Sequence, residues 1–93
     1  MIDSIVKKKW SKKQTVLNSF LSIPNSFTAE IMAAQGYDAL TIDYQHGMID
    51  FNDLFLMLQS IRHSGVTPIC RVSGLDHAVI SKVMDAGAMG IIC

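Results

Sequence analysis

Thr41-Ile42-Asp43-Tyr44-Gln45-His46-Gly47 is the stretch from which the fold and a candidate site can first be inferred. An apolar run that ends in an acid, an amide and an imidazole is typical of a buried strand with polar groups at its carboxyl end. Arg71 closes the next strand-like run in the same way. Two such strand ends predict a solvated site along one edge of a parallel sheet.

Strand-like and helix-like segments alternate along the rest of the chain. We expect strands at residues 15–23, 39–43, 67–72 and 89–93, in the order β-α-β-α-β-α-β. Three helices should separate them, because a capping residue precedes each helical pattern and a glycine follows it. The expected caps are Asn25 or Ser26, Asp50 or Asn52, and Asp76, and the expected stops are Gly36, Gly65 and Gly87.

Apolar residues at helical spacing predict which face of each helix is buried. In the first helix these residues are Phe27, Ile31 and Ala34. In the second they are Leu54, Met57, Leu58 and Ile61, and in the third Val79, Ile80 and Val83.

This alternation implies parallel strands joined by right-handed crossovers, either in an open doubly wound sheet or in a barrel. A dinucleotide-binding sheet should have a Gly-x-Gly-x-x-Gly loop after its first strand, but the chain reads Ile23-Pro24-Asn25-Ser26 there. The even repeat and the polar strand ends favour the first half of a (β/α)8 barrel. Because the sequence stops inside the fourth expected strand, we expect it to be a truncated barrel, the N-terminal piece of a larger protein.

Charge is distributed unevenly along the 93 residues, of which 49% are hydrophobic and 17% charged. Five of the eight basic residues lie between Lys7 and Lys13, which predicts a solvated, basic N-terminal arm over residues 1–13 and a half-barrel over residues 14–93. Residues 14–93 carry three basic and seven acidic groups, a balance that argues against a nucleic-acid partner.

Targeting and cysteine signals are weak. Polar residues interrupt the apolar stretch 16–23, so we expect no secretory signal, and no run is long enough to span a membrane. Cys70 and Cys93 lie in apolar runs without a C-x-x-C spacing, as expected for buried thiols in a reducing compartment such as the cytoplasm.

Four segments in this order resemble the HpcH/HpaI family of pyruvate-dependent class II aldolases. The segments are Ala29-Glu30-Ile31 with Gly36-Tyr37-Asp38, Ile42 to Gly47, Pro68 to Val72, and Met84 to Gly90. The resemblance covers Leu17 to Cys93 and corresponds to the N-terminal part of these barrels. Two departures concern substrate preference: the family commonly has glutamate at Gln45 and often tryptophan near Phe20.

The resemblance implies a reaction in which pyruvate loses a methyl proton and its enolate attacks an aldehyde, or the reverse cleavage of a 2-keto-3-deoxy or 4-hydroxy-2-oxo acid. Imidazole is a suitable base near neutral pH, and the residue matching His46 has that role in similar enzymes. The arginine matching Arg71 binds the substrate and stabilises the enolate charge. A structural salt bridge between Arg71 and Asp43 is the competing explanation, and Asp43 could also orient His46.

Asp85, Gln45, Glu30 and two further histidines are the other candidate residues. The family assigns the aspartate matching Asp85 to raising the basicity of the histidine, yet the predicted order places Asp85 at the opposite edge of the sheet. Either the predicted helix boundary is wrong, or Asp85 acts on His46 indirectly or across a subunit contact. The remaining alternative is that Asp85 is a structural residue. Gln45 is a supporting residue, while Glu30 is as easily a helix charge as a site residue. His63 and His77 are read as helix-surface residues.

The resemblance also implies a divalent metal (Mg, Mn or Co), small-molecule substrates and a homo-oligomer. No metal-ligand spacing occurs within this chain, so the metal ligands are expected beyond residue 93 and the chain alone is expected to be inactive. The alternative function is a non-catalytic half-barrel that assembles with another chain or binds a keto acid.

Overall fold

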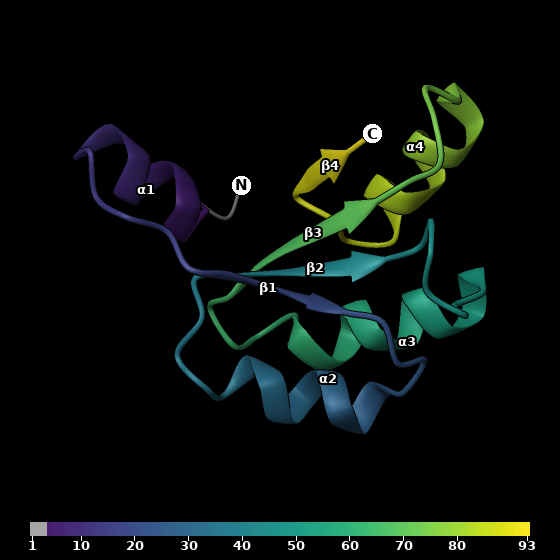
Figure 1. Ribbon diagram of the computed structural model, residues 1–93, viewed down its shortest axis with the longest axis horizontal. Coiled ribbons are helices and arrows are strands. Elements are labelled where there is room, and N and C mark those ends of the chain that lie inside the picture. Colours follow the sequence, from purple (N-terminus) through teal and green to yellow (C-terminus); the bar gives the residue numbers. More distant parts are fainter. Residues whose placement is uncertain (1–3) are drawn as a thin grey trace.

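The computed structural model describes residues 4–93 as a parallel sheet with helices packed on it (Figure 1). The elements in chain order are α1 (Ile5–Ser11), β1 (Asn18–Leu21), α2 (Ser26–Ala33), β2 (Ala39–Asp43), α3 (Phe51–Ile61), β3 (Thr67–Arg71), α4 (His77–Asp85) and β4 (Gly90–Ile92). The four strands are all parallel and lie in the order β1-β2-β3-β4. This is the repeating β-α arrangement predicted for half of a (β/α)8 barrel.

The centre of the sheet is the most deeply buried part of the chain. All five residues of β2 are buried, and its Asp43 pairs in register with Arg71 of β3. Helices α2 and α3 lie along the same side of the sheet (Figure 1). Because Asp43 and Arg71 are register partners, the polar carboxyl ends of β2 and β3 meet at the same end of the sheet, as the sequence predicted.

The three predicted helices begin at N-cap residues that the sequence had indicated. Asn25 accepts a hydrogen bond from the Thr28 amide at the start of α2, and Asp76 caps α4. Asp50 and Asp53 form a reciprocal capping box on α3. Gly36, Gly65 and Gly87 all have positive φ. Gly87 directly follows the C-cap of α4 as predicted, whereas Gly36 and Gly65 lie two and three residues beyond the C-caps of α2 and α3.

The buried face of α3 was predicted correctly and that of α2 was not. Leu54, Met57, Leu58 and Ile61 are all buried. In α2 the buried residues are Ala29 and Ala33, whereas Phe27, Ile31 and Ala34 are exposed. Apolar residues occur on several faces of α2, so their spacing does not single one out. The observed packing buries the small alanines, which let the helix approach its neighbours closely.

The prediction of a solvated arm over residues 1–13 was wrong where the structure describes it. Ser4 caps α1, and its hydroxyl lies 2.9 Å from that of Thr67, with which it shares a buried hydrogen bond. Val6 is buried, and Lys9 Nζ lies 2.8 Å from an Asp38 carboxylate oxygen. The lysine run concealed these contacts because lysine side chains can remain exposed while their helix packs through other residues.

Two smaller expectations also need correction. The first strand is shorter than residues 15–23, because it begins only at Asn18 and ends at Leu21. Cys70 is buried as expected, and burial raises the pKa of its thiol to about 12, but Cys93 is exposed because it follows the end of β4. Within residues 4–93 no helix is both long and apolar enough to cross a membrane.

Candidate functional site

Asp43 and Arg71 form a bidentate ion pair at the carboxyl ends of β2 and β3. Arg71 Nε donates to Asp43 Oδ1 at 3.1 Å, and Arg71 Nη2 donates to Asp43 Oδ2 at 2.6 Å. Their backbones are partners in the ladder, so the sheet register itself sets up this contact. The Asp43 side chain is nearly buried, while Arg71 is partly open to solvent. The salt bridge considered as the structural alternative for Arg71 is therefore present.

The ion pair fixes the protonation state of both groups. Hydrogen bonds from Arg71 lower the pKa of Asp43 to about 2, against the opposing effect of burial, and the His46 amide contributes further. The same contact raises the pKa of Arg71. Asp43 is consequently an anion at neutral pH and is poorly suited to act as a base.

The loop after β2 folds back onto the same carboxylate. The His46 amide donates to Asp43 Oδ1 at 2.9 Å, and the Gly47 amide donates to the Asp43 carbonyl at 3.0 Å. A Cβ atom on Gly47 would lie 2.3 Å from that carbonyl oxygen, so only glycine fits this turn. Asp43 therefore orients both Arg71 and the backbone of His46.

The His46 imidazole is exposed at this edge of the sheet. Tyr44, its neighbour in the loop, donates its amide to the Arg71 carbonyl at 3.1 Å, which ties the loop to β3. The loop after β2 and the Arg71 side chain thus lie at the same carboxyl end of the sheet. That the His46 imidazole and the Arg71 guanidinium converge on one ligand stays a prediction.

Phe20 is a site residue that sequence reasoning did not select. Its ring centroid lies 4.9 Å from Arg71 Cζ, close enough for a cation–π contact. Alternation along the strands places Phe20, Asp43 and Arg71 on one face of the sheet. The signal that could have found it is its position near the carboxyl end of β1, two residues beyond Asn18 on that face.

The remaining predicted residues are not gathered at this edge. Asp85 is the last residue of α4 and precedes β4, so it lies toward the edge where the strands begin, as the predicted element order indicated. Gln45 is exposed in the loop beside His46, and Glu30 is exposed on α2. His63 and His77 are also exposed, in agreement with their interpretation as surface residues.

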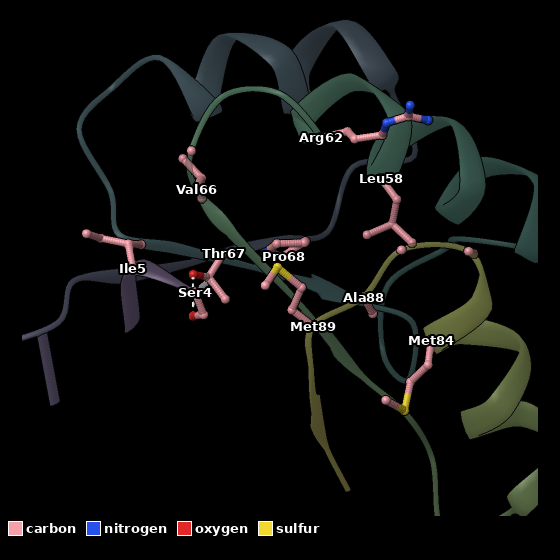
Figure 2. Close-up of a pocket in the computed structure, with 13 residues that line it drawn as sticks. Ser4, Ile5, Leu58, Arg62, Val66, Thr67, Pro68, Met84, Ala88 and Met89 are labelled. Atoms are coloured by element: carbon pink, nitrogen blue, oxygen red, sulfur yellow. Dashed lines mark hydrogen bonds between the residues drawn. The ribbon is translucent and has the colours of Figure 1, made fainter. Parts of the chain in front are cut away.

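A cavity of about 440 Å³ opens at the edge opposite the ion pair (Figure 2). Its lining includes Thr67 and Pro68 at the start of β3, together with Met84, Ala88 and Met89 around the end of α4. Ser4 closes one side through its hydrogen bond to Thr67. This cavity is largely apolar and lies away from Asp43 and Arg71, so we assign it no part in the candidate site.

The donor atoms present do not make a metal site. Among residues 4–93 there is no group of three histidine, cysteine, aspartate or glutamate side chains placed to hold an ion. Both oxygens of Asp43 already accept hydrogen bonds from Arg71. Residues 4–93 therefore do not by themselves fit the divalent metal that the resemblance implies.

Comparisons with known proteins agree on one kind of relative. No family model matches the chain. A hydroxypyruvate/pyruvate aldolase from Rhizorhabdus wittichii is 39% identical over 87 residues, which are 94% of this chain and 35% of that protein. The crystal structure of an HpcH/HpaI aldolase from Desulfitobacterium hafniense superposes with a TM-score of 0.84 at 26% identity, covering 96% of this chain and 35% of that one. The chain is similar to the N-terminal part of pyruvate aldolases and of HpcH/HpaI aldolases.

The similarity extends along nearly the whole chain, but the chain spans only about a third of the length of these relatives. Another structure with a TM-score of 0.84, at 34% identity, is the citrate synthase SbnG; the match covers 92% of this chain and 35% of that one. Proteins named for different substrates therefore share this arrangement of strands and helices.

Proposed function

We propose that the protein carrying this chain is a carbon–carbon lyase of the pyruvate aldolase type. It would form or cleave the bond between the pyruvate enolate and an aldehyde, acting on 2-keto-3-deoxy or 4-hydroxy-2-oxo acids. The observation that carries the proposal is the Arg71 guanidinium, held by Asp43 at the carboxyl edge of the sheet beside the His46 loop. The aldolase names of its relatives support the same reaction class.

Arg71 is the group that would bind negative charge. A guanidinium has five N–H donors, and the contacts with Asp43 use two of them. The other three have no hydrogen-bond partner within residues 4–93, and the side chain is partly open to solvent. Fixed donors of this kind can stabilise a carboxylate or an enolate oxygen without reorganising during the reaction.

His46 is the group that would take the methyl proton of pyruvate. Its backbone is tethered to Asp43 while its imidazole is free of hydrogen bonds within residues 4–93. An exposed imidazole can accept a proton near neutral pH, directly or through one water molecule. Asp43 itself remains ionised and serves to position the two other residues.

Three further parts of the proposal lie outside the described contacts. A divalent cation would require ligands from outside residues 4–93, since these residues contain no group of three histidine, cysteine, aspartate or glutamate side chains placed to hold one. An assembly of several copies is proposed from the resemblance. Asp85 could act on His46 only across a subunit contact or indirectly, because within one chain the two residues belong to opposite edges of the sheet.

The test is exchange of pyruvate methyl protons for deuterium by the complete protein that carries this chain. We expect exchange in the wild type and a rise of about tenfold in the KM for pyruvate in Arg71→Lys, because an ammonium cannot reproduce the planar fork. Arg62→Lys is the matched control, since Arg62 is exposed at the end of α3.

Two results would count against the proposal. No exchange in the wild type would favour the non-catalytic half-barrel. An unchanged KM in Arg71→Lys would show that the pair with Asp43 is structural only.

A further inference from the structure

Phe20 contributes little to the hydrophobic core. Its side chain is 46% exposed and it is not among the residues of the buried core cluster. Its neighbour Leu21, by contrast, is buried in that cluster. Core packing within the described chain therefore does not account for a large aromatic ring at position 20, whose centroid lies 4.9 Å from Arg71 Cζ.

The contacts of Arg71 leave one part of the guanidinium open. Asp43 occupies the edge formed by Nε and Nη2, and the Phe20 ring lies 4.9 Å from Cζ. The outer edge, formed by Nη1 and the second N–H of Nη2, makes no hydrogen bond within residues 4–93. Two N–H groups on one edge can bind two oxygen atoms of a planar anion in a bidentate manner.

Two strands therefore restrain the arginine that a third strand carries. Phe20 lies on β1, Asp43 on β2 and Arg71 on β3. The carboxylate alone fixes one edge of the guanidinium but leaves the plane free to tilt about that edge. An aromatic ring close to Cζ opposes this motion, because the attraction depends on how the cation lies relative to the ring.

We infer that Phe20 is a positioning residue that holds the Arg71 guanidinium so that its outer edge receives the oxygen atoms of a 2-oxo acid. This inference rests on the proposed function for the identity of the ligand. The orientation of Arg71 by Phe20 can be measured without any substrate.

The first experiment follows the Arg71 Nε–H signal by NMR in the complete protein, prepared with isotope-labelled arginine and measured without substrate. Phe20→Leu removes the aromatic ring but keeps an apolar side chain, and Phe20→Tyr keeps the ring. We expect faster exchange of the Nε proton with solvent in Phe20→Leu and a nearly wild-type rate in Phe20→Tyr. Phe27→Leu is the matched control, because Phe27 is an exposed phenylalanine on α2.

The second experiment measures KM and kcat for pyruvate proton exchange in the same variants of the complete protein. We expect Phe20→Leu to raise the KM about three- to tenfold, as the loss of one cation–π contact allows, and Phe20→Tyr to remain within about twofold of wild type. Phe20→Met replaces Phe20→Leu if the latter does not fold.

The outcomes separate the two claims. An Arg71 Nε–H signal that is the same in Phe20→Leu and wild type overturns the inference, and so does an unchanged KM in a protein that exchanges pyruvate protons. A wild-type protein without exchange contradicts the proposed function, while the NMR comparison still decides whether Phe20 orients Arg71.

Discussion

The carboxylate of Asp43 accepts hydrogen bonds from two parts of the chain that are far apart in sequence. One is the Arg71 side chain on the neighbouring strand, and the other is the backbone amide of His46, three residues after Asp43. Sequence reasoning found all three residues because each lies at or just after a strand end. It could not decide whether Arg71 pairs with Asp43 or faces a ligand, since one guanidinium has enough donors for both.

Acid should weaken the fold through Asp43. Its pKa is about 2 in the folded chain, below the ordinary value of 3.8, so the unfolded chain takes up the proton first as the pH falls. The stability due to this ion pair is complete above about pH 4 and is lost as the pH falls toward 2. Urea unfolding at several pH values should show this loss in the wild type and a weaker pH dependence in Asp43→Asn.

Asp85→Asn is the control for that series, because Asp85 is exposed and its carboxylate accepts no hydrogen bond within residues 4–93. If the free energy of unfolding changed between pH 4 and pH 2 by the same amount in Asp43→Asn as in the wild type, the assigned ion pair would be contradicted.

Individual elements differed in how well the sequence predicted them. Helix α3 was predicted in detail because Asp50 caps it and its apolar residues occupy one face. The buried face of α2 was mistaken because large apolar residues such as Phe27 and Ile31 stand on the solvent side, while close packing uses Ala29 and Ala33. Helix α1 was missed because lysines dominate its sequence, and its anchoring contacts involve residues distant along the chain.

The loop between β2 and α3 should not tolerate a side chain at Gly47. A methyl group there would meet the Asp43 carbonyl oxygen at 2.3 Å, so the turn that carries His46 must shift. We expect Gly47→Ala to lower the free energy of unfolding by about 1–3 kcal/mol. Gly74→Ala, in the loop after β3, meets nothing within 4 Å and should change it by less than about 0.5 kcal/mol. Equal effects in chemical denaturation would contradict this geometry.

At the scale of the whole molecule, one face of the sheet is only partly covered. A groove of about 670 Å³ runs between α1 and the strands, lined by residues that include Trp10, Thr41, Ile69 and Ile92. Among the described strands, β1 and β4 each have a neighbour on one side only. In a closed barrel the remaining strands would cover this face and pair with both edges.

A polypeptide of residues 1–93 alone should therefore associate with itself. Open strand edges can pair with other chains, and burial of the exposed apolar face contributes roughly 25 cal/mol per Å². We expect species larger than the monomer in sedimentation and a broad thermal transition. A soluble monomer with one sharp cooperative transition would show that the half-barrel is a stable domain by itself.

The most direct test of the central claim is the exchange of pyruvate methyl protons in His46→Ala of the complete protein. Loss of a general base commonly slows a reaction by about 10²–10⁴-fold, so we predict a fall of that size in the exchange rate. His63→Ala, which removes an exposed histidine beyond α3, should keep the wild-type rate. Exchange at the wild-type rate in His46→Ala would contradict the assignment of His46 as the base.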